Sequence, residues 1–208
     1  MIFHRIMDTK PGGDYGIRLH QSKLENAKIF NSRCGLSAYC AARLRRSTRI
    51  AELGVMSGLF SIFLHDLFVG AEVHLFDLDF SQLVEEVKRN ECFKMHLGYS
   101  HITMSSMPDN YFDFIYVDGD HSYEGVSNDI IASLRCLRDG GIIQFNDYAN
   151  YGRDERRVYG VLEAVNGFLE TAQCEVVGLS LERSGYHDLA VIVNKDKDVA
   201  KIRCHNLP

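Results

Sequence analysis

Short apolar runs alternate with amphipathic stretches along most of this chain. The stretches 126–137 and 158–169 carry apolar residues at the three- and four-residue spacing of a helix that buries one face. The apolar runs have the length of buried strands and occupy 49–53, 72–76, 112–117 and 141–145. Strands that alternate with amphipathic helices predict βαβ units, and therefore an α/β fold with a mostly parallel sheet.

The C-terminal part departs from this alternation. Two strand-like runs, 176–181 and 189–193, are separated only by the polar segment 182–188. A connection of that length cannot hold a crossover helix, so the two runs should form an antiparallel hairpin. A parallel sheet that ends in such a hairpin differs from the ordinary dinucleotide-binding fold.

Local signals predict several element boundaries. Ser37 suits the N-cap of a short helix. Asp79, with Gln82 three residues later, suits a capping box. The pair at 140–141 is Gly-Gly, which is expected just past a helix C-terminus. The segment 102–107 predicts a further short strand and its exit.

Length and composition fit one compact domain preceded by a short arm. The chain has 208 residues, of which 46% are hydrophobic, and this is enough to fill a core. Residues 1–36 carry the weakest pattern, and we interpret them as an N-terminal arm that helps to cover the substrate site. Residues 37–208 then form the main domain.

Charge and cysteine usage narrow the classes of partner. A formal charge of −5 disfavours binding along a nucleic-acid backbone, and the arginines within 43–49 are interpreted as a solvated helix face. No segment approaches the roughly 20 apolar residues of a membrane span, and the N-terminus has no apolar signal run, so we expect a cytoplasmic protein without membrane contact. The six cysteines form no close C-x-x-C pair, which favours reduced thiols over a zinc site.

A glycine-containing turn follows the first predicted strand. Glu52 precedes Gly54, Ser57 and Gly58, and helical residues come next. Glycine permits a tight turn and close approach of a ligand, and the following helix presents free N–H groups there. The spacing is G-x-x-x-G, whereas a pyrophosphate site favours G-x-G-x-x-G. The turn is either a ligand loop or an ordinary strand-to-helix turn with a buried, hydrogen-bonded Glu52.

A carboxylate follows the second predicted strand. Asp77 lies close to the offset of about 20 residues at which such folds place a ribose-binding acid. A carboxylate accepts two hydrogen bonds and so matches a cis diol. Asp79 is the alternative, but it has the competing role of a helix cap. We therefore expect Asp77 to bind ribose hydroxyls.

The most specific signal follows the fourth predicted strand. The segment 116–125 reads YVDGDHSYEG, and the next strand ends in Phe-Asn-Asp-Tyr at 145–148. These motifs, in this order and at these strand ends, resemble the class I methyltransferases that depend on S-adenosylmethionine, in particular the macrocin-type sugar O-methyltransferases and, more distantly, the catechol-type O-methyltransferases. The resemblance covers roughly residues 35–150, and the C-terminal hairpin extends it.

The resemblance implies a cofactor site. The family's E/D-x-G-x-x-x-G motif wraps the methionine part of S-adenosylmethionine, which assigns Glu52, Gly54, Ser57 and Gly58 to the cofactor pocket. Related enzymes often place an acidic residue near the adenine after the third strand. This chain has serines there, and Ser105 is the candidate contact.

The resemblance also implies the chemistry. Asp118, Asn146 and Asp147 lie at neighbouring strand ends and offer the oxygen ligands that Mg²⁺ prefers, although catechol-type enzymes have Asp-Asn where this chain has Asn-Asp. A metal would lower the pKa of an acceptor hydroxyl. In the metal-free alternative, Asp118 holds the amino group of the cofactor's methionine part. His121 stands where the catechol-type base is a lysine, with Asp120 as the rival general base.

The functional prediction is methylation of a hydroxyl on a sugar or small natural product. The loop 150–157 should border the acceptor pocket. Two alternatives remain: a nicotinamide-dependent oxidoreductase, and a non-catalytic binding protein with the same fold. The sequence leaves open a homodimer, the identity of the acceptor, and O- against N-methylation.

Overall fold

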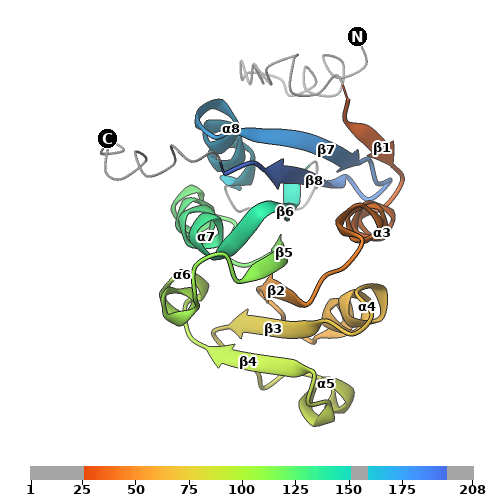
Figure 1. The fold of residues 1–208 in the computed structure, drawn as a ribbon, viewed down its shortest axis with the longest axis vertical. Helices are drawn as coiled ribbons and strands as arrows, with labels where there is room; N and C mark the ends of the chain where they lie inside the picture. The colour runs from red at the N-terminus through yellow and green to blue at the C-terminus, as the bar shows by residue number, and fades with distance from the viewer. Residues whose placement is uncertain (1–25, 151–158, 196–208) are drawn as a thin grey trace.

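The computed structural model describes residues 26–150 and 159–195, which form one mixed sheet with helices on both faces (Figure 1). The described strands are ordered β1-β7-β8-β6-β5-β2-β3-β4. They are β1 (Lys28–Phe30), β2 (Arg49–Leu53), β3 (Glu72–Asp77), β4 (Phe93–Leu97), β5 (Phe112–Val117), β6 (Leu137–Asn150), β7 (Cys174–Ser180) and β8 (Tyr186–Val193). The helices are α3 (Arg33–Leu44), α4 (Leu59–Leu67), α5 (Glu85–Arg89), α6 (Ser100–Thr103), the 3₁₀ helix η1 (Met104–Ser106), α7 (Tyr123–Cys136) and α8 (Val161–Thr171).

The sheet is parallel except at one strand. Parallel pairing joins β4, β3, β2, β5 and β6, and β1 pairs parallel with β7. Strand β8 runs antiparallel between β6 and β7. The predicted α/β class, with a mostly parallel sheet and a C-terminal antiparallel hairpin, is therefore confirmed. The parallel strands end at one edge of the sheet, where ligands bind in folds of this kind.

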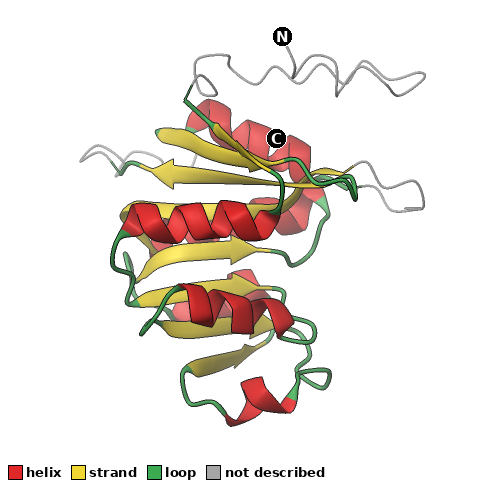
Figure 2. Cartoon of the chain, turned by 90° about the vertical axis from the view of Figure 1, so that its right-hand side faces the viewer, coloured by secondary structure: helices red, strands yellow, loops and turns green. Residues whose placement is uncertain are grey.

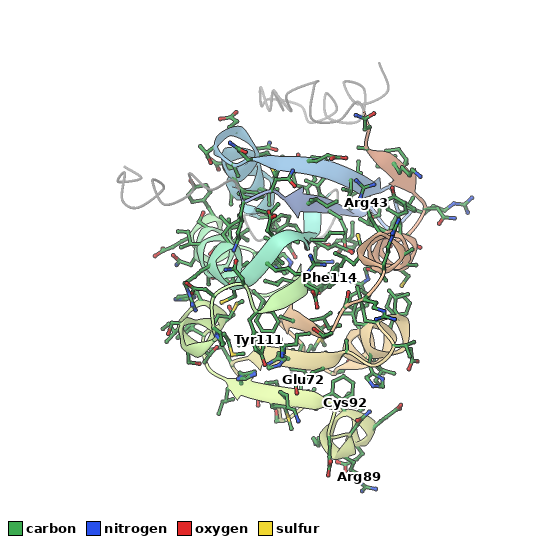
Figure 3. The ribbon with its side chains drawn as sticks, in the orientation of Figure 1. Arg43, Glu72, Arg89, Cys92, Tyr111 and Phe114 are labelled. Carbon is green, nitrogen blue, oxygen red and sulfur yellow. The ribbon has the colours of Figure 1, made fainter. Side chains whose placement is uncertain are left out.

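Helices cover both faces of the sheet. Figure 1 shows α3, α4 and α5 on one side and α6, α7 and α8 on the other, and Figure 2 shows the strands stacked behind the first set. In the central strand β5, Phe114 packs in the α3–α5 layer and Ile115 in the α6–α8 layer, both without exposed surface. Phe114 lies inside the molecule in Figure 3. Burial on both faces explains why β5 has a continuous apolar run.

The strand predicted at 102–107 is wrong. Those residues lie in α6, η1 and their exit, and the strand before them is β4, Phe93–Leu97. Strand β4 lies at the sheet edge, and Lys94, Met95 and Leu97 are exposed there. An edge strand of this kind buries too little apolar surface to leave a strong pattern.

Three predicted helix boundaries are also wrong. Helix α3 begins earlier than expected, with Ser32 as its N-cap, and Ser37 is buried inside it. Asp79 caps no helix, because its carboxylate accepts hydrogen bonds from the Ser81 backbone N–H and hydroxyl at 2.8 and 2.6 Å. Helix α7 ends at Cys136, and the Gly-Gly pair lies inside β6, where Gly140 has a φ of 67°.

The boundary predicted at residue 36 stays a prediction. Residues 1–25 lie outside the described part, whereas β1 pairs with β7 and α3 packs on the sheet. None of the described helices is long and apolar enough to span a membrane.

Candidate active site

A cavity of about 960 Å³ opens at the carboxyl edge of the parallel strands. Its walls come from the loops after β2, β3, β4 and β5, with side chains from α3, α4 and α7. Several predicted site residues line it: Glu52, Gly54, Ser57, Asp77, Asp118, Asp120 and His121. Gly58, Ser105, Asn146 and Asp147 are not among its lining residues.

The glycine turn after β2 has the backbone that its sequence requires. Gly54 has a φ of +82°, and a Cβ added there would lie 2.1 Å from the carbonyl oxygen of Asp118. Only glycine combines that conformation with such a close approach of two backbone segments. Gly58 has a φ of +79° and is the N-cap of α4. The turn therefore brings the end of β2 directly against the end of β5.

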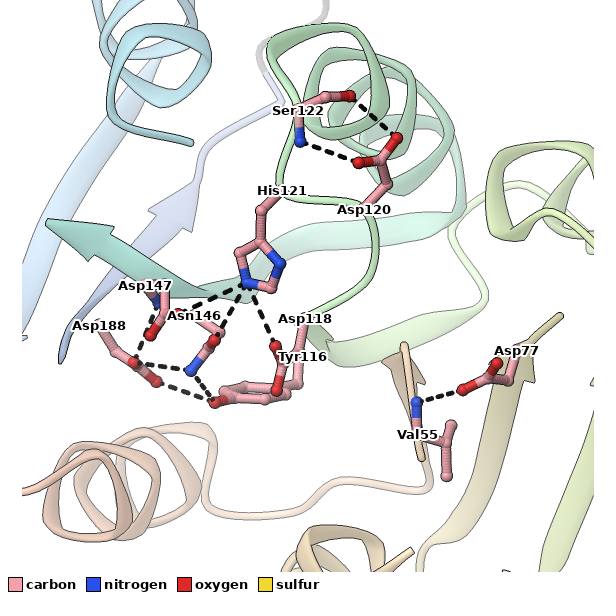
Figure 4. A network of polar contacts seen from close by, with 10 residues as sticks. All are labelled: Val55, Asp77, Tyr116, Asp118, Asp120, His121, Ser122, Asn146, Asp147 and Asp188. Carbon is pink, nitrogen blue, oxygen red and sulfur yellow. Dashed lines mark hydrogen bonds and ion pairs between the residues drawn. The ribbon is translucent and has the colours of Figure 1, made fainter. Parts of the chain in front are cut away.

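Asp77 fixes this turn from the neighbouring strand. Its Oδ2 accepts hydrogen bonds from the backbone N–H groups of Val55 and Met56, at 2.6 and 3.1 Å, and its Oδ1 accepts one from Asp79 N–H at 3.1 Å. Figure 4 shows the Val55 contact at a distance from the other polar groups of the site. Asp77 lines the cavity and Asp79 does not, and the role of Asp77 as a ribose ligand stays a prediction.

Glu52 is a buried acid at the cavity wall. Only 1% of its surface is exposed, and it accepts a hydrogen bond from the Ser61 hydroxyl. Burial raises its pKa from 4.5 to about 8, against the opposing effects of the Ser61 hydrogen bond and the Arg33 charge. A cation bound beside Glu52 would offset the cost of ionising it.

Asp118 is the second acid at this end of the cavity. Burial raises its pKa well above the ordinary value, and the carboxylates of Glu52, Asp188 and Asp147 raise it further. The positive charge of Arg33 lowers it. Two acids with raised pKa values form a site that is poised to receive a cationic group.

The cavity also contains a polar pair to which no sequence pattern pointed. Asp129, on α7, is 2% exposed and accepts a hydrogen bond from the Ser100 hydroxyl, and burial raises its pKa to about 6. Both residues line the cavity, whereas Ser105 is exposed in η1. Ser105 was chosen because the preceding strand was misplaced, and the loop after β4 contributes Ser100 instead.

His121 faces a group of side-chain oxygen atoms that follow β5 or lie in β6. Its Nε2 lies 3.5 Å from Asp118 Oδ1, 3.4 Å from Asn146 Oδ1 and 3.7 Å from Asp147 Oδ2 (Figure 4). The ring also packs 4.8 Å from that of Tyr159. The strand-end residues predicted to meet are thus brought together, with His121 connecting them to the cavity.

A buried network determines how Asn146 is oriented. Its Nδ2 donates hydrogen bonds to the Tyr116 hydroxyl at 3.0 Å and to Asp188 Oδ1 at 3.2 Å, which turns its Oδ1 toward His121. Asp188 is 1% exposed and also accepts hydrogen bonds from Tyr116 and Gln144. Burial raises the pKa of Asp188 to about 6. The sequence analysis missed this acid on β8.

The predicted metal ligands do not form a ready cation site. Within 26–150 and 159–195, no group of three or more His, Cys, Asp or Glu side chains is arranged to hold a metal ion. The point faced by the oxygens of Asp118, Asn146 and Asp147 is taken by His121 Nε2. Mg²⁺ would need His121 to move away, so the set as placed does not fit the ion.

Local contacts hold the loop that carries His121. Asp120 accepts hydrogen bonds from the Ser122 backbone N–H and hydroxyl, both at 2.9 Å, and Ser122 caps α7. The backbone N–H of Gly160 donates to the His121 carbonyl at 2.8 Å. Both carboxylate oxygens of Asp120 are therefore engaged in holding the loop. The polar contacts of the His121 ring are made through Nε2, so of the two candidate bases His121 is the one with a ring nitrogen, Nδ1, outside these contacts.

A family comparison identifies the segment that carries the site. Residues 51–148, from β2 into β6, match the model of a family described as a methyltransferase domain. This segment is a methyltransferase domain. The prediction of an S-adenosylmethionine-dependent methyltransferase is thereby confirmed. Comparison with curated proteins finds no match.

Solved structures similar to this methyltransferase share its fold. TomG, an O-methyltransferase of tomaymycin synthesis from Streptomyces achromogenes solved with S-adenosylmethionine, has 17% identity and a TM-score of 0.61, over 77% of this chain and 80% of TomG. An O-methyltransferase from Bacillus cereus has 17% identity and a TM-score of 0.58, over 76% and 79%. The 1,6-didemethyltoxoflavin N1-methyltransferase of Burkholderia thailandensis has 16% identity and a TM-score of 0.59, over 77% of each chain.

Proposed function

We propose that this methyltransferase transfers a methyl group from S-adenosylmethionine to a hydroxyl of a small molecule, such as a sugar or natural product, with His121 as general base. The position of His121 carries the proposal. Its ring lines the cavity, and its Nε2 faces the oxygens of Asp118, Asn146 and Asp147.

The cavity offers a group for each part of the cofactor. Asp77 accepts a hydrogen bond from a ribose hydroxyl through Oδ1, which has a second lone pair beyond its contact with the Asp79 N–H, whereas Oδ2 already accepts two backbone hydrogen bonds. Glu52 and Asp118 face the methionine ammonium. Ser100 and Asp129, which also line the cavity, face the adenine.

The reaction needs a base and close placement of donor and acceptor. His121 turns Nε2 toward the oxygens, which favours a proton on that nitrogen and leaves Nδ1 to accept one from the acceptor hydroxyl. The acceptor oxygen then attacks the methyl carbon, and the breaking C–S bond leaves its electron pair on sulfur. Asp118 and Asp147 stabilise the imidazolium that forms. Holding the two reactants together supplies much of the rate.

A hydroxyl is favoured over an amine as the acceptor. A neutral amine attacks through its lone pair, whereas a hydroxyl gains most from a base that removes its proton as it attacks. TomG and the Bacillus protein are O-methyltransferases, but the toxoflavin enzyme methylates nitrogen on the same fold. The fold therefore leaves this choice to the site. The loop predicted to border the acceptor, 150–157, lies outside the described side chains.

Magnesium at Asp118, Asn146 and Asp147 stays a prediction. Since His121 occupies the point that these oxygens face, we derive no step through a metal. Turnover should therefore continue in excess chelator. Loss of activity with chelator, restored by Mg²⁺, would return these three residues to the role of metal ligands.

A turnover assay tests the proposed reaction. The purified protein is given methyl-labelled S-adenosylmethionine and a panel of sugars, phenols and amines. The account expects labelled ethers, and a loss of about 10²- to 10⁴-fold for His121→Gln. Asp120→Asn separates the rival base, because it should retain far more activity. Wild-type turnover by His121→Gln would refute the base assignment, and methylation of amines alone would favour N-methylation.

The remaining alternatives are tested by the same assay. The nicotinamide-dependent oxidoreductase loses support from the methyltransferase match and from the G-x-x-x-G turn. A non-catalytic binding protein would give no labelled product with any acceptor. A small-molecule acceptor, no role for nucleic acid, and a homodimer stay predictions.

A further inference from the structure

Arg33 is a cationic side chain at the cavity that the predicted site did not include. It is the first residue of α3, and it lies outside the segment 51–148 that matches the methyltransferase family. Its position is well fixed. Ser32 caps the helix by accepting a hydrogen bond from Gly35 N–H at 3.1 Å, and the Arg33 N–H donates to Glu182 Oε1.

The guanidinium of Arg33 is held at one end of the cavity. Its central carbon lies 5.0 Å from the centre of the Phe60 ring, and both residues line the cavity. A flat guanidinium over an aromatic face keeps its N–H donors in a defined direction.

This end of the cavity pairs one cation with two acids. Among the described residues that line the cavity, within 26–150 and 159–195, Arg33 is the only Arg or Lys. Arg33 lies over Phe60, whose ring centre is 4.5 Å from that of Tyr116, and Tyr116 pairs in register with Glu52 and comes two residues before Asp118. The charge of Arg33 also lowers the pKa values of both carboxyls. The resulting pattern, one guanidinium beside two carboxyls, is complementary to an α-amino acid, which carries one carboxylate and one ammonium.

We infer that Arg33 binds the carboxylate of the cofactor's methionine part, while Glu52 and Asp118 face its ammonium. This inference rests on the proposed function, since it takes S-adenosylmethionine as the ligand. It assigns the specificity for an amino acid end group to α3, an element outside the matched methyltransferase segment.

A binding cycle tests the inference. Wild type and Arg33→Met are each titrated by calorimetry with S-adenosylhomocysteine and with its decarboxylated analogue, which keeps the ammonium. Methionine retains an apolar stem over Phe60 and removes the charge. We expect Arg33→Met to weaken S-adenosylhomocysteine binding about 10- to 100-fold. The dissociation constants of the decarboxylated analogue for the two proteins should agree within about threefold, because this ligand has no carboxylate for Arg33 to bind.

A matched control and the other outcomes separate the explanations. Arg43→Met removes a cation from the same helix, whose guanidinium reaches Glu175 at 3.5 Å away from the cavity (Figure 3), and it should bind like wild type. Wild-type affinity in Arg33→Met would overturn the inference, and so would an equal loss for both ligands, which indicates a structural role. If wild type binds neither ligand, the proposed cofactor itself is wrong.

Discussion

Neutralising Glu52 should make the protein more stable at alkaline pH. Glu52 is almost fully buried, and its pKa is raised from 4.5 to about 8, chiefly by burial. The folded state therefore holds a proton that the unfolded state releases above pH 4.5. The stabilisation is complete below pH 4.5 and is lost as the pH rises toward 8. The loss is about 1.4 kcal/mol per pH unit across that interval, or about 5 kcal/mol in all.

Glu52→Gln removes this titration while retaining an acceptor for the Ser61 hydroxyl. The assay is urea unfolding of wild type and variant from pH 5 to pH 9, without cofactor. Other acids also titrate, so the measured quantity is the difference in unfolding free energy between the two proteins. That difference should move in favour of the variant by about 3 kcal/mol between pH 6 and pH 9.

Glu175→Gln serves as the matched control for the Glu52 experiment. It neutralises a carboxyl on β7 that is 47% exposed, so it shows what the loss of a surface carboxyl alone does to the difference. A difference for Glu52→Gln that stays flat with pH would refute the reasoning, because it would mean that Glu52 ionises in the folded protein as easily as in the unfolded chain.

Three further predictions follow from the site. Gly54→Ala should lose more than about 90% of its affinity for S-adenosylhomocysteine in calorimetry, because the new Cβ would meet the Asp118 carbonyl at 2.1 Å; unchanged affinity would contradict the turn geometry. Gly160→Ala would place a Cβ 2.2 Å from Tyr123 N and so shift the loop that carries His121. The kcat should therefore fall about tenfold while the affinity for the cofactor is unchanged, and an unchanged kcat would argue against a role of Gly160 in positioning His121. Cofactor binding near pH 7 should release a proton from Glu52, measured as a dependence of binding heat on the buffer's ionisation enthalpy; heats independent of buffer would argue against an ammonium beside this acid.

The central strands could be predicted from the sequence because they are buried on both faces of the sheet. Strands such as β5 are covered on both faces, so their apolar runs are continuous. The edge strand β4 buries little besides Phe93, so the apolar pattern predicts a strand at 102–107 instead of at 93–97. The same error affects the site, because it points to Ser105, whereas Ser100 lines the cavity.

The candidate site was predictable where its residues follow a strand directly. Glu52, Asp77, Asp118 and His121 all lie at strand ends or just beyond, and parallel topology brings such positions together. Residues contributed by helices or by the antiparallel strand gave no comparable signal. Arg33, Asp129 and Asp188 reach the site through tertiary packing, and Asp188 is buried only because a polar network satisfies it.

The most direct test of the account is calorimetric titration with S-adenosylhomocysteine of wild type, Asp77→Ala and Asp79→Ala. The two aspartates are close in sequence, but only Asp77 lines the cavity. The account predicts saturable binding by wild type, at least about a tenfold loss for Asp77→Ala, and near-wild-type affinity for Asp79→Ala. No binding by the wild-type protein would contradict the assignment of this cavity to the methyl donor.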